Sequence, residues 1–144
     1  MAASLREQLL ARVATVLMGA TPAGASVFRA REVSIARDVC PAITILYRGT
    51  PMTERRGQAA DQHHVDFDIA IFVRGDPWDT AADAIDVPTH QLLMADPQLR
   101  ALGMELVRRG DDVEAEEADR TAGCLIVHYR ATFFTSARDL SALP

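Results

Sequence analysis

The sequence contains no lysine and no asparagine, so all 15 of its basic residues are arginines. The absence of a lysine amine excludes Schiff-base formation and every other mechanism that needs this group. No apolar run approaches the ~18–20 residues of a membrane-spanning helix. The N-terminal segment MAASLREQLLARV lacks the uninterrupted apolar stretch of a signal peptide. We therefore expect a protein with no membrane partner that is made and used in a cytoplasm.

Cysteine is scarce as well. Cys40 and Cys124 are the only two, and they are too far apart for a C-x-x-C motif. In a cytoplasm we expect two reduced, partly buried thiols, and a bridge between them remains the alternative.

Acidic residues outnumber basic ones. The 144-residue chain has 20 acidic residues and 15 arginines, which give it a formal net charge of −5. Phosphate binding needs basic surface, so we expect no sequence-specific nucleic-acid partner. Hydrophobic residues make up 49% of the chain, which is enough for one buried core. We expect a single domain over residues 1–135 and a loosely held C-terminal tail over residues 136–144.

Two helices are predicted. Ser4-Leu5-Arg6-Glu7 forms a capping box, and Gly19 is a suitable helix stop. Asp76-Pro77 is typical of an N-cap and first helical position, and Pro88 is expected to kink or divide the helix that follows. The buried stripe of the first helix would contain Leu5, Leu9, Val13, Val16 and Leu17.

Strand patterns account for most of the remaining sequence. Residues 42–48 form a β-rich run closed by Gly49, and residues 64–74 alternate strongly, with an apolar side chain at every odd position from 65 to 73. Further strands are expected at 27–29, in the region that residues 99–107 lead into, and over 124–134, with a polar connection at 50–61. This order predicts an α/β (α+β) fold, in which two main helices pack on one face of a mostly antiparallel, four- to five-stranded sheet.

The segment HHVDFD, residues 63–68, could be a metal site or a polar strand face. His64 and Asp66 share one face of the strand, and His128 on the last strand is the obvious third ligand. These three residues would define a small metal-dependent hydrolase. The competing interpretation is a solvated or partner-facing strand surface and its lead-in, and we favour it. We assign no metal-ligating, catalytic or cofactor-binding residue.

The sheet face away from the helices has a mixed composition. It is too apolar for ordinary solvent-facing surface and too charged for core, which favours contact with another chain. A loop or the C-terminal tail folding over this face is the alternative. Its predicted residues are Thr44, Leu46, Arg48, Asp66, Asp68, Phe72, Arg74, Ile126, His128, Arg130 and Phe134.

The acidic run at 111–119 is predicted to be the ragged end of a strand and a hairpin tip. Its simplest role is a solvated loop. In an assembly, its carboxylates would instead meet Arg55 and Arg56 of a neighbour or bridge through a divalent cation such as magnesium.

Several short sequence segments resemble the tail terminator family of long-tailed phages, of which the lambda-type minor tail protein U is typical. The similarity covers nearly the whole chain. It rests on the order and spacing of the predicted elements and on the residue patterns of the strands. These segments are Pro41-Ala42-Ile43-Thr44-Ile45, the strand 64–73, Ala95-Asp96-Pro97-Gln98-Leu99, Asp111-Asp112 and the strand 125–134.

The resemblance implies a non-enzymatic virion protein of a phage or prophage. Its subunits would close into a homohexameric ring that caps the tail tube, ends tube polymerisation and joins the head. The implied partners are further copies of the chain, the tail tube protein and a head-completion or connector protein. Assembly would take place in the cytoplasm of the bacterial host, and the ring would remain in the virion tail. Magnesium would favour ring assembly without being a resident cofactor.

The two alternatives are another neck or tail-completion protein of the same assembly, and the metal-dependent hydrolase. The expected subunit or tube contacts are Arg55, Arg56, Asp66, Asp68, Arg74, Asp111, Asp112, Glu114 and Arg130.

Overall fold

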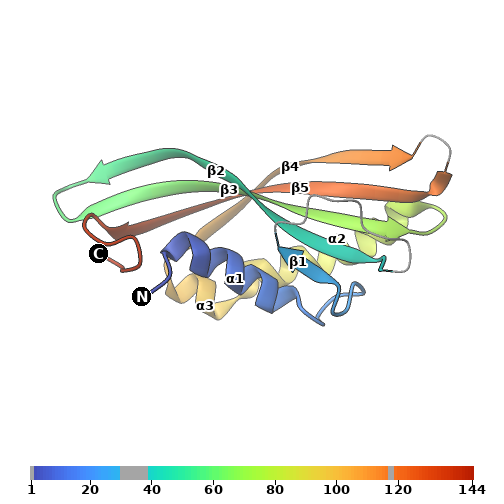
Figure 1. Ribbon diagram of the computed structural model, residues 1–144, viewed down its shortest axis with the longest axis horizontal. Helices are drawn as coiled ribbons and strands as arrows, with labels where there is room; N and C mark the ends of the chain where they lie inside the picture. The colour runs from blue at the N-terminus through green and yellow to red at the C-terminus, as the bar shows by residue number, and fades with distance from the viewer. Residues whose placement is uncertain (1, 30–38, 117–118) are drawn as a thin grey trace.

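The computed structural model describes residues 2–29, 39–116 and 119–144, and these residues form two layers (Figure 1). One layer is a five-stranded sheet with the strand order β1-β2-β3-β5-β4. The helices all lie on one face of this sheet, and neighbouring strands are antiparallel except for β1 and β2. The predicted α+β class and mostly antiparallel sheet are therefore confirmed. The elements are α1 (Leu5–Leu17), β1 (Val27–Arg29), β2 (Ala42–Arg56), β3 (Ala60–Arg74), α2 (Trp78–Ala95), α3 (Pro97–Ala101), β4 (Glu105–Glu116) and β5 (Asp119–Ser136).

Helix α1 begins as its capping sequence predicts. The Ser4 hydroxyl oxygen accepts a hydrogen bond from the backbone N–H of Glu7 at 3.1 Å. The Glu7 carboxylate does not complete the capping box, because it pairs with Arg29 of β1. Of the predicted stripe, only Val16 is not fully buried.

Helix α2 differs from its prediction in two ways. It is one element with Pro88 inside it, so the proline does not divide the helix. Its N-cap is Pro77 and not Asp76, and no side chain caps it. The start of α2 is fixed by packing, because the Trp78 ring lies against Gly123 of β5. Within the described chain, no helix has the length and apolar character needed to cross a membrane.

The connection predicted at 50–61 is wrong, because these residues extend the β2–β3 hairpin. Strand β2 continues to Arg56, β3 starts at Ala60, and only residues 57–59 form the turn. Backbone pairing continues through the polar segment, for example between Thr53 and His63. Polar side chains are tolerated here because this end of the hairpin projects beyond the helices (Figure 1).

The hairpin predicted at 111–119 is also longer than expected. Strand β4 continues to Glu116, which pairs with Asp119 at the start of β5, so the acidic residues 111–116 belong to a strand. Residues 117 and 118, part of the predicted tip, lie outside the described residues. The short helix α3 was not predicted, and it begins where Asp96 accepts a hydrogen bond from the Leu99 N–H.

The core lies between the helices and the central strands β3 and β5. The predicted inward-facing residues of β3 are all buried, from Val65 to Val73. Phe67 stacks on Tyr129 across the two strands with ring centroids 5.6 Å apart. Each large apolar side chain buried in this way contributes roughly 1.5–3 kcal/mol. This layer fixes one face of the sheet, and no helix among the described residues lies on the opposite face, called here the open face.

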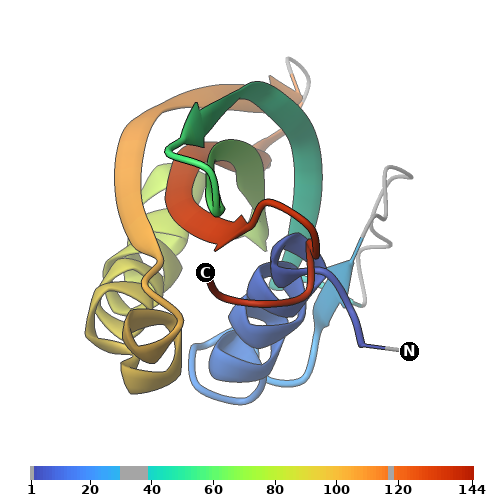
Figure 2. The same ribbon diagram turned by 90° about the vertical axis from the view of Figure 1, so that its left-hand side faces the viewer.

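The C-terminal residues return to the start of α1 (Figure 2). The Leu5 N–H donates to the carbonyl of Leu140, and the Ser136 N–H donates to the carbonyl of Ala142. The Ala137 N–H donates to the carbonyl of Ala59 in the β2–β3 turn. The proposed boundary at residue 135 remains a prediction.

Candidate functional site

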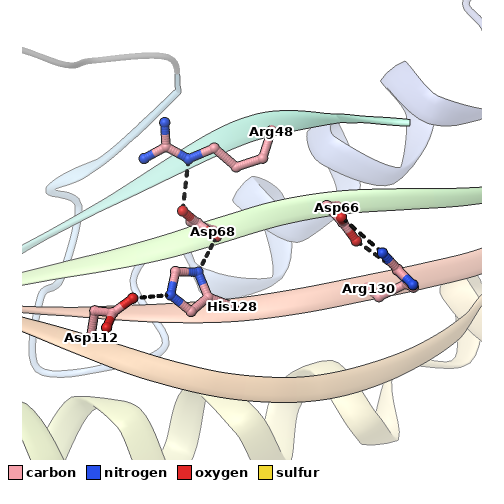
Figure 3. A network of polar contacts seen from close by, with 6 residues as sticks. All are labelled: Arg48, Asp66, Asp68, Asp112, His128 and Arg130. Carbon is pink, nitrogen blue, oxygen red and sulfur yellow. Dashed lines mark hydrogen bonds and ion pairs between the residues drawn. The ribbon is translucent and has the colours of Figure 1, made fainter. Parts of the chain in front are cut away.

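A chain of polar contacts crosses the open face of the sheet (Figure 3). Arg48 of β2 donates from Nε to Asp68 Oδ2 of β3 at 2.7 Å. The other oxygen of Asp68 lies 2.7 Å from Nδ1 of His128 on β5, and His128 Nε2 lies 2.7 Å from Asp112 Oδ2 on β4. Four neighbouring strands are therefore linked through side chains as well as through their backbones.

The position of His128 between two carboxylates favours its charged form. Both ring nitrogens must carry a proton to donate to Asp68 and Asp112 at the same time. The hydrogen bond to Asp68 and then the one to Asp112 raise the pKa of His128 above its usual value. Because Asp68 is buried, the first of these bonds is partly shielded from solvent.

A second ion pair lies beside this chain of contacts. Arg130 of β5 donates from Nε to Asp66 Oδ1 at 2.7 Å and from Nη2 to Asp66 Oδ2 at 3.0 Å. This two-point pairing lowers the pKa of the Asp66 carboxyl, mainly through the hydrogen bond from Arg130. Asp66 is therefore an ionised, partnered carboxylate at neutral pH.

Two β-bulges lie at the sides of this cluster. The strand register shifts between Tyr47 and Gly49 in β2 and between Arg108 and Gly110 in β4. Arg48 and Arg109 are the extra residues at these shifts. The following glycines have φ angles of 118° and 135°, which other residues rarely adopt. No atom lies within 4 Å of an added Cβ at either glycine, so the backbone angle and not space requires glycine.

The two bulge arginines border one hollow on the open face. Its volume is about 450 Å³. Its lining residues are Arg48, Asp66, Asp68, Arg109, His128 and Tyr129.

The structure brings four of the predicted contact residues together in this cluster: Asp66, Asp68, Asp112 and Arg130. The other five lie elsewhere. Arg55 pairs with Asp61 and Arg56 with Glu54, both on the β2–β3 hairpin.

Three further predicted residues are also outside the cluster. Arg74 is at the far end of β3, opposite Ala122. Asp111 pairs with Arg108, which also binds Asp86 of α2. Glu114 lies on edge strand β4, opposite Cys124. The proposed contact between Arg55 or Arg56 and a neighbour's acidic run remains a prediction.

The sequence analysis placed Arg48 on this sheet face without naming it among the expected contacts, and it missed Arg109. A weak signal was present in the Arg-Gly dipeptides at 48–49 and 109–110, although the same dipeptide also occurs at 56–57 and 74–75, where strands end. A glycine inside a strand pattern indicates a bulge.

The proposed metal ligands do not converge. His64 is opposite Thr132 and His128 is opposite Asp68, so the two histidines are four positions apart along β3 and β5. The Asp66 carboxylate is bound by Arg130. Within residues 2–29, 39–116 and 119–144, no three histidine, cysteine or acidic side chains are placed to hold a metal ion.

The prediction that HHVDFD is an exposed strand face and its lead-in is wrong for Asp68, which lies on that face but is buried, and for His63. The His63 side chain is buried on the helix side of the sheet, where its nitrogens contact the hydroxyls of Thr53 and Thr135. Burial lowers the pKa of His63, which favours the neutral ring. These threonine partners explain how a histidine is accommodated at a buried position.

The open face is not uniformly exposed. At the end nearest the start of β2, Thr44 and Cys124 are buried. Burial raises the pKa of the Cys124 thiol to about 12, so this thiol is a poor nucleophile. At the opposite end, Met52, Val107 and Phe134 are 50%, 51% and 40% exposed. This end of the face therefore combines exposed apolar side chains with the polar cluster.

Neither protein-family models nor curated proteins give a match to this chain.

Proposed function

We propose that the chain is a structural protein of a long-tailed phage or prophage, a tail terminator that acts by assembly. Copies of the chain form a ring on the end of the tail tube, stop its polymerisation and provide the surface to which the head is joined. The partners are other copies of the chain, the tail tube protein and a head-completion protein. The ring assembles in the bacterial cytoplasm and stays in the virion tail.

The observation that carries this proposal is the open face of the sheet, at the end where its apolar side chains are exposed. Met52, Val107 and Phe134 are exposed on it, beside the ion-paired cluster of Asp66 and Arg130. Contact surfaces between proteins combine an apolar centre with arginines and a polar rim in this way. A face of this kind favours a binding role for the chain.

Ring closure gives a physical reason for a polymer to stop. A head-to-tail interface that closes on itself leaves no free end for another copy. Two different surfaces of each copy must then meet, and the open face and the extended hairpins supply such surfaces.

The first test is native mass spectrometry over a range of protein concentrations, with and without magnesium. We expect a closed oligomer of about six copies. A monomer that carries one stoichiometric zinc would contradict the proposal and favour the metal-dependent hydrolase. If the protein is a metal-free monomer, the tube-length assay described next decides whether the proposal holds.

The second test adds the protein to polymerising tail tube protein and measures tube length by electron microscopy. We expect shorter tubes with a ring at one end. The double variant Val107→Ser with Phe134→Ser should lose this effect. The matched control, Met18→Ser with Val87→Ser, removes side chains of similar exposure from the helix layer and should keep it. Tubes unaffected by the wild-type protein would end the proposal.

A further inference from the structure

The two bulge arginines hold an unusual position on the open face. Arg48 and Arg109 are on strands β2 and β4, and two central strands lie between them. Three strand spacings separate their backbones, or about 14 Å. Both residues nevertheless border the same hollow. The bulges therefore place two permanently charged residues on opposite sides of one space.

These arginines have hydrogen-bond donors that the described residues do not use. Arg48 bonds to Asp68 through Nε alone, and its terminal nitrogens point away from Asp68 in Figure 3. Arg109 makes no hydrogen bond or ion pair with any described residue, although its charge acts on Asp66. A guanidinium carries five N–H donors in a fork that suits carboxylate and phosphate oxygens.

The carboxylates at the bottom of the hollow do not leave it negatively charged. Asp66 is bound at two points by Arg130, and Asp68 is bound by Arg48 and His128. Around the hollow, Arg48, Arg109 and Arg130 balance Asp66, Asp68 and Asp112 in formal charge. The charge on His128 then makes the cluster net positive.

We propose that this hollow is an oxyanion-binding site, in which Arg48 and Arg109 together bind a carboxylate or a similar anionic group. The group belongs either to an acidic side chain of a protein partner or to a free anion. This inference does not depend on the tail role, because a ring could form with the hollow empty.

Binding should depend on pH through His128. The charged groups that face it are Asp68 of β3 and Asp112 of β4, with Arg48, Asp66, Arg109 and Arg130 nearby. Loss of the His128 proton removes one positive charge, so affinity for an anion should fall as pH rises. His64 is on the same face and contacts Thr132, which makes His64→Gln the matched control for His128→Gln.

The experiment titrates the full-length protein with two probes, sulfate and an N-acetylated hexaglutamate peptide that has no titrating α-amino group, by calorimetry at pH 6 and pH 8. Both probes keep their charge over this range, so a change in affinity reports on the protein. We expect saturable binding that Arg109→Ala weakens about tenfold, because a charge-assisted bond is lost. Arg100→Ala removes an exposed arginine of α3, in the other layer, and should bind like wild type.

Each outcome decides the question. Binding of the peptide alone identifies a protein partner's acidic segment, and binding of sulfate alone identifies a free anion. Binding of both supports the oxyanion class. Equal affinities for Arg109→Ala and Arg100→Ala, or no saturable binding of either probe, would overturn the proposal. A pH dependence that survives His128→Gln but disappears in His64→Gln would remove His128 from it.

Discussion

Asp66 and Arg130 face each other on the two central strands and are joined by hydrogen bonds of 2.7 and 3.0 Å. Their side chains are 31% and 30% exposed, so solvent screens the pair only in part. In a double-mutant cycle with Asp66→Asn and Arg130→Ala, we expect a coupling free energy of about 1 kcal/mol at pH 7. Urea unfolding of the four proteins measures it. The pair of Arg55 and Asp61 serves as the control and should couple less, because it has a single hydrogen bond and its arginine is 59% exposed.

The same coupling should disappear in acid. The pKa of Asp66 is lowered in the folded chain. Its contribution is therefore complete above the unfolded value of about 3.9 and is lost as pH falls through the folded-state pKa. Repeating the cycle at successively lower pH checks this. A coupling that persists after the carboxyl is protonated would show that the pair is held by packing and not by charge.

His128 should show the opposite pH dependence. Its pKa is raised, so its stabilising contribution is complete below the unfolded value of about 6.5 and is lost as pH rises through the folded-state pKa. His128→Gln should lower the free energy of unfolding by about 0.5–1 kcal/mol at pH 5.5, after allowance for solvent screening, and by less at pH 8.5. Equal losses at the two pH values would contradict the charged form.

Asp96 has two structural roles that substitution can separate. It caps α3 and also pairs at two points with Arg12 of α1, and its side chain is only 4% exposed. Asp96→Asn keeps an acceptor for the cap and should cost about 1–2 kcal/mol. Asp96→Ala also leaves the Leu99 N–H without its cap and should cost about 3 kcal/mol. Thermal and urea unfolding measure both. Equal costs would mean that the cap contributes nothing.

Gly123 is required by close packing. A Cβ at this position would lie 2.3 Å from the Trp78 ring. Gly123→Ala should therefore destabilise the fold by about 2 kcal/mol or more, because the start of α2 must move away from the sheet. In a Trp78→Ala background, the same substitution should cost much less. A similar cost in both backgrounds would point to the glycine backbone and not to the tryptophan.

The inner part of the sheet was predictable because the helices cover one of its faces. In β3, the residues from Val65 to Val73 that face the helices are all apolar and buried, which produces the alternation that the sequence displays, although Asp68 and Ala70 on the other face are buried as well. The segments 50–56 and 111–115 have no comparable pattern, since their residues are mostly exposed. Helix α3 has only five residues, which is too short for a helical period to show.

The site was predictable in part for a similar reason. Strand parity places Asp66, Asp68 and Arg130 on one face, and the structure confirms that they share it. The alternation of side chains along a strand does not determine the register between neighbouring strands. It is the register of β3 and β5 that places His128 beside Asp68. Parity also fails at a bulge, so Arg109 could not be assigned to the site without recognising the role of Gly110.

The hairpin that extends beyond the helices divides β3 into two parts of different local stability. Backbone amides near Ile69 lie under a packed helix layer and should exchange with deuterium only through global unfolding. Amides near Asp61 belong to the same strand, but few buried apolar contacts hold them, so they should exchange through small local openings. The 15-residue strand β3 would thus be locally stable near Ile69 and would open readily near Asp61.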